Sequence, residues 1–514
     1  MHSIPEELAS LLKKHPKITL HLFFESIPGT PSAGLYPDSV SPEQSVTALQ
    51  GAINLVSLDV RATFNRDDQQ ESRAFTTALR DLILTSPNLQ TLSLNILETS
   101  RIRNIFSNYT GLGFSSGSRP PPLTDLQISD YPWGQAWHPA NIGPGHPNPI
   151  LYPNPGIEQT YWADKFDWSS LHRFRENKTP ILTPHITRHL IALKEVEFNF
   201  HGSTRNINNP HAQQTADAIF LKDVPSLLSS ISINSLTHVG LHSLKRHVSH
   251  LRKLVIHTPE AWSRKETTLV SSYGWNQLDG FINHYDLQQL CDALPQLEEF
   301  GIDMDRGGTE RDEWPRSMLS ILAGFPRLRR LGIWFELGAM GDAEAVPRPY
   351  LDWGGAVWIY EYLRERRVQK GRGVGLERLE VNAGTPCAPG GGLDGSRGTG
   401  SGDDAGNWAR NNATGFVCEL ALWHGDGFTV RCPWLSNVEN RRLERMAKGE
   451  EKGVWNPEVD SFLFRAAMMG PVGLEEWEGP VIQRRLRQMG ESLKGGRKGG
   501  MGMGRYLPWR EGGE

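Results

Sequence analysis

One short pattern occurs twice between Leu294 and Phe335, and it constrains the fold of this chain more than any other feature of the sequence. The two copies read LPQLEEFGIDM and FPRLRRLGIWF. Because the side chains of a strand alternate between two faces, the last two apolar positions of each copy predict a strand with one buried face. Apolar anchors occupy the first, fourth and sixth positions of each pattern: Leu297, Phe300 and Ile302, then Leu328, Leu331 and Ile333.

A segment with helical spacing precedes each predicted strand. Apolar residues recur at helical intervals over 286–294 and again over 316–325, which predicts one helix in each segment. Each unit therefore consists of a helix, a proline-marked corner and a strand. The L-x-x-L-x-L pattern is the strand signature of a leucine-rich repeat, and a unit of this kind stacks on its neighbours because it cannot cover its own apolar face.

The same anchor pattern recurs along most of the chain. The last anchors Val60, Leu94 and Ile128 follow one another at intervals of 34 residues, which indicates a repeat. We predict an α/β fold: an irregular leucine-rich-repeat-like solenoid with one parallel sheet, outer helices and a small C-terminal cap. Further anchor sets begin at Leu171, Leu193, Leu228, Leu251 and Leu376, and further helices are expected over 74–85 and 356–367.

Changes in composition divide the chain. The segment 129–164 is rich in Pro, Gly, Trp and Asn, and we interpret it as an insertion that is either disordered or a peptide-contacting loop. An Asp-Gly pair between two apolar runs predicts a hairpin near residue 426. The predicted parts are the solenoid at 1–384, a Gly-rich linker at 385–407, a hairpin and helix cap at 408–489, and a disordered tail at 490–514.

Composition also narrows the class of partner and the compartment. The formal net charge is −4, so the whole chain exerts no attraction on nucleic acid or an anionic membrane. The four cysteines include no CxxC pair, which argues against a disulfide scaffold or a zinc module. The N-terminal segment lacks an apolar signal core, and no run of about 18 apolar residues occurs. We therefore expect a cytoplasmic or nuclear protein with no nucleic-acid partner, no membrane partner, no cofactor and no metal.

The sequence contains two kinds of motif that resemble catalytic or metal sites. A serine hydrolase acting through Ser115, which lies in a G-x-S-x-G match, is the enzymatic alternative; serines, an arginine and prolines follow where that motif requires a helix. His185 with His189, and His247 with His250, have metal-ligand spacing but no third ligand beside them. We expect no catalytic residue and no enzymatic activity.

The predicted strands define an outward row of side chains. Residues that alternate with the anchors point away from the core, and the resulting face is mostly polar with mixed charge. Such a face suits a protein or an extended peptide better than a small molecule. Trp334 and His257 are the best anchor candidates, although Trp334 has the alternative of packing under a neighbouring loop. The predicted partner-binding residues are Asn199, Asn234, His257, Asp303, Trp334 and Asn382.

Several segments resemble one known family when they are taken in order. FDWSSLHRF, HLRKLVIHTPE, LPQLEEFGIDM, the tripeptide EWP and FPRLRRLGIWFELG are similar to the irregular repeat region of the fungal F-box and leucine-rich-repeat protein family, over roughly residues 50–385. The resemblance implies a substrate receptor of a Skp1–cullin–F-box ubiquitin ligase. In such a receptor the F-box binds Skp1 and the repeats bind the target.

The chain departs from that family pattern in two respects. The predicted repeats begin almost at the first residue, so we expect either that this member has lost its F-box or that the F-box lies upstream of the sequence, in which case Skp1 is a partner. The positions three residues after the last anchors also lack the Asn or Cys of typical repeats, as at Thr63, Leu97 and Tyr131. Without an asparagine ladder, we expect an irregular array rather than a regular horseshoe.

Overall fold

A computed structural model gives the fold of the chain. The protein forms two compact units, residues Met1–Ser230 (unit 1) and Ile231–Glu514 (unit 2). Among the residues that the structure describes, no helix has the length and apolar character needed to cross a membrane. The described residues are 11, 15, 19–26, 42–65, 69–99, 112–114, 117–131, 162–176, 184–198, 218–234, 236–257, 282–305, 313–335, 349–372, 375–384, 412–421, 427–451 and 461–469.

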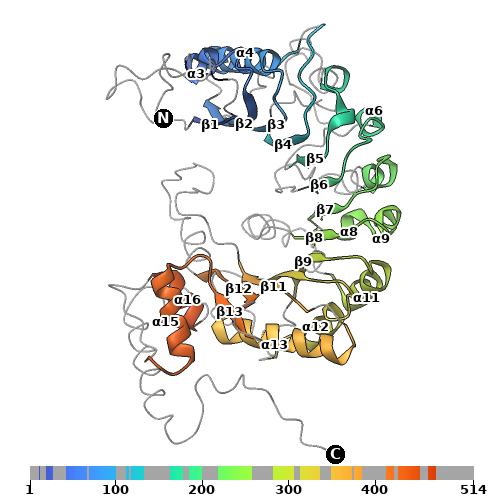
Figure 1. The fold of residues 1–514 in the computed structure, drawn as a ribbon, viewed down its shortest axis with the longest axis vertical. Helices are drawn as coiled ribbons and strands as arrows, with labels where there is room; N and C mark the ends of the chain where they lie inside the picture. Colours follow the sequence, from blue (N-terminus) through green and yellow to red (C-terminus); the bar gives the residue numbers. More distant parts are fainter. Residues whose placement is uncertain are drawn as a thin grey trace, which may run out of the picture. The chain divides into compact units, whose positions relative to one another are not determined.

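Unit 1 consists of parallel strands with helices on one side. In Figure 1 the helices α3 and α4 lie over one face of the first strands. Consecutive strands from β1 to β6 pair in parallel. The strands are β1 (Leu20–Ser26), β2 (Leu55–Asn65), β3 (Thr91–Thr99), β4 (Asp125–Asp130), β5 (Arg173–Glu176) and β6 (Glu195–Phe198); the helices are α3 (Pro42–Ala48), α4 (Gln69–Thr85), η3 (Trp168–Ser170) and α6 (Pro184–Thr187).

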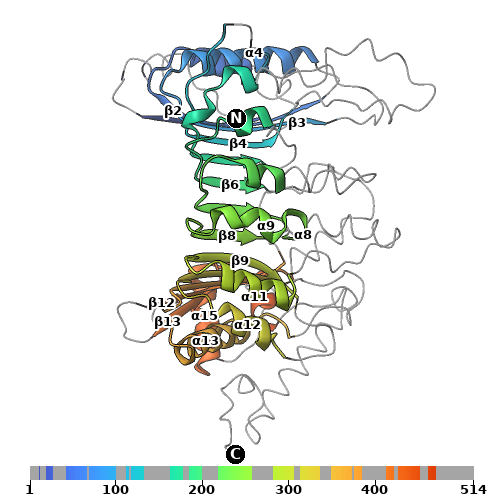
Figure 2. The ribbon, with the colours of Figure 1, turned by 90° about the vertical axis from the view of Figure 1, so that its right-hand side faces the viewer.

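Unit 2 continues with the same alternation of helix and strand. The view in Figure 2 shows α11 and α12 in front of the strands, so these helices cover one face of the sheet. The strands are β7 (Ser230–Ile233), β8 (Lys253–Ile256), β9 (Glu299–Met304), β10 (Arg330–Phe335), β11 (Arg378–Ala383), β12 (Thr414–Leu420) and β13 (Phe428–Arg431). The helices are α8 (Leu236–Val239), α9 (Leu241–Leu244), η4 (Lys245–His247), α11 (His284–Ala293), α12 (Arg316–Leu322), α13 (Trp353–Gln369), α15 (Asn437–Ala447) and α16 (Phe462–Met469).

Within each unit, the described strands follow chain order in an open sheet. Strands β8 to β11 pair in parallel, whereas β11, β12 and β13 pair antiparallel. The antiparallel pair β12 and β13 lies where the sequence predicts a hairpin. The prediction of a mixed α/β protein with a mostly parallel sheet is therefore confirmed.

The core is formed by the predicted anchors. Leu331 and Ile333 of β10 pair with Phe300 and Ile302 of β9, and all four side chains are buried. In unit 1 the register joins Val60 to Leu94 and Leu94 to Ile128, so the interval of 34 residues corresponds to one step across the sheet. The anchors of neighbouring strands thus stack in continuous apolar rows.

One core position departs from the apolar pattern. Glu176 occupies the last anchor position of β5, where it pairs with Ile128 on one side and with Phe198 on the other. Its side chain is buried. The anchor pattern does not predict a carboxylate in this row, because burial of a charge is costly without compensating partners.

The two ends of the predicted insertion at 129–164 are packed into unit 1. Tyr131 and Trp162 are buried, and their rings meet edge to face with centroids 5.6 Å apart. The Tyr131 hydroxyl accepts a hydrogen bond from the Leu112 N–H at 2.7 Å. The rest of this insertion, the linker at 385–407 and the tail at 490–514 lie outside the described residues.

Local capping accounts for helix ends that the periodicity places differently. Helix α15 begins at Asn437, because Ser436 and Glu439 form a reciprocal capping box there. Helix α13 begins at Trp353, three residues before the expected start, because the Asp352 side chain accepts the Gly355 N–H at 2.6 Å.

The buried anchor row makes a direct prediction for Leu331→Asp. The substitution places a carboxylate among side chains shared by β9, β10 and β11, so we expect a loss of more than about 4 kcal/mol of unfolding free energy. Urea denaturation monitored by circular dichroism measures this loss of unfolding free energy. Arg330→Asp is the matched control, since Arg330 is exposed, and it costs at most about 1 kcal/mol. Equal melting of Leu331→Asp and the parent would show that the assigned register is wrong.

A second prediction concerns Asp352 and pH. Burial raises the pKa of the Asp352 carboxyl from 3.8 to about 6. The folded protein therefore keeps this proton where the unfolded chain has lost it, and the contribution to stability is lost as pH rises through the folded pKa. Asp352→Asn retains an oxygen acceptor for the helix and does not titrate. Between about pH 4 and pH 6.5, we expect the unfolding free energy of the parent to fall by about 2 kcal/mol relative to that of the variant. Urea denaturation at several pH values measures this difference. If the unfolding free energies of parent and variant changed with pH in the same way, the raised pKa of Asp352 would be contradicted.

Candidate functional site

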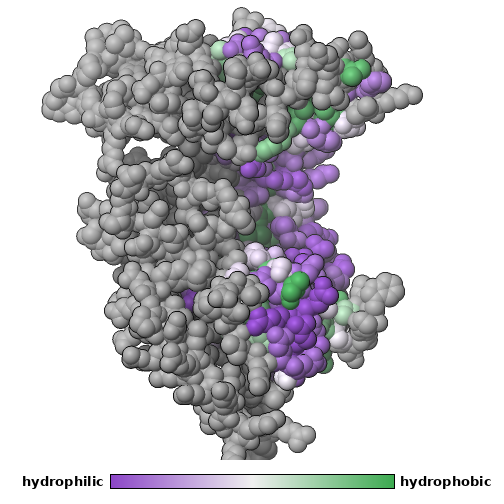
Figure 3. Space-filling model, turned by 90° about the vertical axis from the view of Figure 1, so that its left-hand side faces the viewer, coloured by the Kyte–Doolittle hydropathy of each residue, from purple (hydrophilic) through white to green (hydrophobic). Residues whose placement is uncertain are grey.

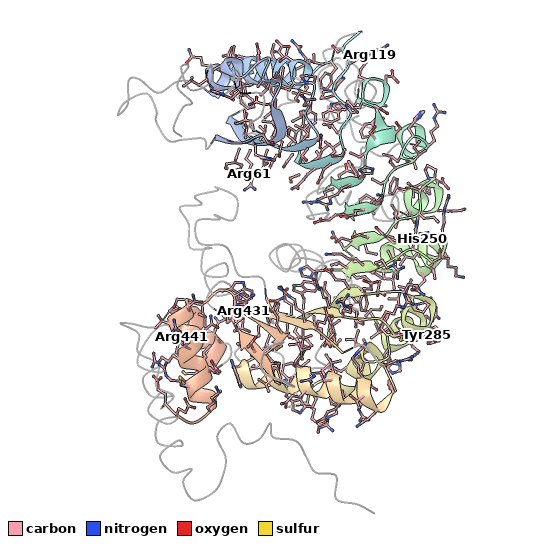
Figure 4. All side chains as sticks on the ribbon, viewed as in Figure 1. Arg61, Arg119, His250, Tyr285, Arg431 and Arg441 are labelled. Atoms are coloured by element: carbon pink, nitrogen blue, oxygen red, sulfur yellow. The ribbon has the colours of Figure 1, made fainter. Side chains whose placement is uncertain are left out.

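In unit 2, the side chains that alternate with the buried anchors of β8 to β12 form three rows, which we call the outward face. The rows follow the strand register, and His257 directly follows β8. Helix α11 lies on the other side, where Tyr285 points away from the strands (Figure 4). The first row contains Lys253, Glu299, Arg330, Arg378 and Glu419; the second contains Val255, Gly301, Gly332, Glu380 and Val417; the third contains His257, Asp303, Trp334, Asn382 and Gly415.

The first row consists of charged residues that neutralise one another. Lys253 Nζ lies 2.6 Å from Glu299 Oε1, and Arg330 Nη1 lies 4.0 Å from Glu299 Oε2. On the next strands, Arg378 Nη1 lies 3.0 Å from Glu419 Oε1. Each of these side chains is at least one third exposed, so each pair contributes only about 0–1 kcal/mol.

A further line of charges directly before the strands alternates in sign. Arg252 Nη1 lies 3.3 Å from Glu298 Oε1, and Arg329 Nη2 lies 2.6 Å from Glu377 Oε1. The outward face therefore presents no large area of a single charge at the start of its strands. A partner attracted there by net charge alone would meet both signs.

The second row provides space for an aromatic ring. Gly301 and Gly332 are neighbours in the register of β9 and β10. A Cβ placed on Gly301 would lie 2.9 Å from Cζ3 of Trp334, and one placed on Gly332 would lie 2.9 Å from Cη2 of the same ring. The far edge of the indole thus approaches the backbone of both strands, which a larger residue at either glycine would prevent.

The third row holds that ring in place. The imidazole of His257 stacks on the indole of Trp334 with centroids 4.2 Å apart and planes inclined by 20°. The same imidazole is hydrogen bonded through Nδ1 to Oδ1 of Asp303, 2.5 Å away on the strand between them. Asp303 therefore fixes the orientation of His257, and His257 covers part of Trp334.

A second indole closes the row at β12. A Cβ placed on Gly415 would approach both Oδ1 of Asn382 and Cη2 of Trp434 to less than van der Waals contact. Asn382 is buried although it belongs to the outward face, and its Nδ2 donates to Glu380 Oε1 at 3.4 Å. Trp434 comes from the turn after β13 and is not among the predicted residues. The strand pattern does not identify it, because it reaches Gly415 from outside the strands.

The structure brings three of the predicted residues into direct contact, namely His257, Asp303 and Trp334. Asn382 is paired with Trp334 in the register of β10 and β11. Asn234 directly follows β7, whose last residue accepts the His257 N–H at 3.0 Å. Asn199 lies outside the described residues.

The described contacts of the Trp334 ring come from the outward face itself. They are the stacked imidazole of His257 and the backbone of Gly301 and Gly332. The ring is half-buried against the sheet. We call the set of His257, Trp334 and Trp434 the ring strip.

Other residues with catalytic or metal-binding patterns do not form a site in the described parts of the chain. Ser115 lies outside the described residues. His247 is buried, whereas His189 and His250 are exposed. Within the described ranges, no three His, Cys, Asp or Glu side chains are grouped closely enough to hold a metal ion.

Comparison with models of known protein families finds no match for this chain, and comparison with curated proteins finds none either.

The packing of the ring strip predicts the effect of Gly301→Val. The valine side chain occupies space that the edge of Trp334 now fills, so we expect the indole to move away from His257. The ring-current shift on the His257 imidazole protons should then decrease, as measured by NMR with labelled histidine. Trp334→Ala provides the reference spectrum without the indole. Unchanged His257 resonances in Gly301→Val would contradict the described stack.

Proposed function

We propose that this chain is a non-enzymatic protein–protein interaction scaffold that binds a protein or an extended peptide on the outward face of unit 2. The observation that supports this most is the ring strip on an otherwise polar face. Half-exposed aromatic rings contribute a large share of binding energy in protein interfaces, and polar surroundings give such interfaces their specificity.

The character of the surface favours a macromolecular partner. Small-molecule sites are enclosed and mainly apolar, whereas the charged side chains of the first row are about one third to two thirds exposed. In the view of Figure 3, the described surface is mainly hydrophilic and its hydrophobic areas are small. A partner recognised by a few rings and many polar contacts fits these properties.

We also propose that the fold is an irregular leucine-rich-repeat-like solenoid with a C-terminal cap. The buried anchors that pair in register across neighbouring strands support this proposal. So does the burial of β12 from Thr414 to Cys418, since the segment after β13 protects the end of the apolar rows.

The resemblance to fungal F-box proteins gives the same face a second role. As a substrate receptor of a Skp1–cullin–F-box ubiquitin ligase, the chain would hold its target on the outward face and act in the cytoplasm or nucleus. The sequence segments quoted for the resemblance include β8, β9 and β10, which form that face. Co-purification of Skp1 with the chain would support the receptor role, and its absence would favour a scaffold without a ligase.

The proposed function predicts the outcome of a capture experiment with Trp334→Ala. Tagged parent and variant are incubated with lysate, and the captured proteins are compared by quantitative mass spectrometry. We expect Trp334→Ala to lose at least about 90% of the specific partners, because truncation of a central aromatic residue typically costs more than about 1–2 kcal/mol of binding. Its melting temperature should stay close to that of the parent.

Tyr285→Ala is the matched control for this experiment. Tyr285 is an aromatic residue with 70% exposure, but it lies on α11 and points away from the strands (Figure 4). The control should capture the same proteins as the parent. Equal losses in both variants, or no loss in either, would contradict a binding role for the outward face.

A further inference from the structure

We infer that the ring strip receives a cationic side chain, most favourably an arginine, so that the partner of the outward face is a basic peptide segment. This inference rests on the proposed function and names the chemistry of the partner. It follows from the distribution of charge around the rings.

The charges of the outward face are separated along the strands. Between β8 and β12, the second and third rows contain two carboxylates, Asp303 and Glu380, and no lysine or arginine. The cations of the same strands all belong to the first row and to the line before it. On these strands, the part of the face that holds Trp334 is therefore acidic, although the face as a whole is nearly balanced.

Both carboxylates have partners on the face, and Glu380 remains partly exposed. Glu380 accepts from Arg378 Nη2 and from Asn382 Nδ2, both at 3.4 Å, and its side chain is 39% exposed. Arg378 is also engaged with Glu419 at 3.0 Å. Asp303 bonds to the imidazole of His257, which is charged only when it is protonated. Arg431 on β13 pairs with Val417 of the second row, and its guanidinium lies 3.8 Å from Glu419 of the first row.

The rings supply the second element of the site. The face of an indole attracts a cation through its quadrupole, and tryptophan does so more strongly than other aromatic residues. Trp334 lies on β10, and Trp434 approaches Gly415 on β12, so the two indoles flank the strand that bears Glu380 and Asn382. A side chain bound there can contact a ring and a carboxylate at once.

This combination selects among the possible partner groups. An anionic group would have to lose its hydration beside Asp303 and Glu380, which is unfavourable. A planar guanidinium can stack on an indole while it donates two hydrogen bonds to one carboxylate. An ammonium group lacks that fork, so lysine should bind more weakly than arginine.

A peptide series tests the inference on the full chain. The probes are three fluorescein-labelled peptides of alternating glycine with arginine, lysine or citrulline, the last being neutral and close in shape to arginine. Fluorescence anisotropy measures their affinity. We expect the arginine peptide to bind at least about tenfold more tightly than the citrulline peptide and more tightly than the lysine peptide. Equal affinity for arginine and citrulline would overturn the inference.

Variants of the site separate specific binding from general attraction to an acidic protein. Trp334→Ala and Glu380→Gln should each weaken the arginine peptide by about tenfold. Glu365→Gln on α13 removes an exposed carboxylate from the helical side and should leave the affinity unchanged. Equal effects of Glu365→Gln and Glu380→Gln would overturn the inference. If the alanine variant melts early, Trp334→Leu keeps apolar volume and removes the indole, and the same loss is expected.

The peptide series and the capture experiment fail in different ways. If Trp334→Ala lost captured proteins but the parent did not bind the arginine peptide, the inference of a cationic partner would be overturned. The proposed function would still be supported. Unchanged capture in that variant would overturn the proposed function itself.

Discussion

The sharing of apolar anchors between neighbouring strands is the interaction on which the rest of the structure depends. Leu331 and Ile333 are buried between equivalent side chains of β9 and β11, so no strand completes its own core. Full burial of one such side chain contributes about 1.5–3 kcal/mol. Because the anchors must face the helices, the register of each strand is fixed, and a shift by one residue would exchange the two faces.

The fixed register determines where the outward side chains lie. It brings Gly301 beside Gly332, which gives the Trp334 ring access to the backbone, and it sets Asp303 between His257 and Trp334. The ring strip is therefore a consequence of the same alternation that buries the anchors. Its geometry depends on two glycines that have no side chain with which to bind a partner.

The sequence predicts the anchors and three contacting residues of the site because both follow from a period of two within strands. Other features of the site and the core do not follow from this alternation within strands. Trp434 reaches Gly415 from a turn beyond an antiparallel hairpin, and no repeat relates it to the strands. The role of Gly301 becomes evident only when its cross-strand neighbour is known. Glu176 breaks the apolar pattern at a buried position, and its surroundings, rather than its sequence context, determine whether a charge is tolerated.

The charges at the start of β8, β9 and β10 limit whether such a chain can lose the repeat that contains β9. Removal of β9 together with its helix would bring Lys253 beside Arg330 and Arg252 beside Arg329, so that both lines would lose attraction and gain repulsion at once. Like charges placed opposite each other on neighbouring strands are destabilising. The apolar anchors are nearly interchangeable between repeats, whereas the charges of β9 favour its present neighbours. Loss of the repeat that contains β9 is thus disfavoured even where the core could close again.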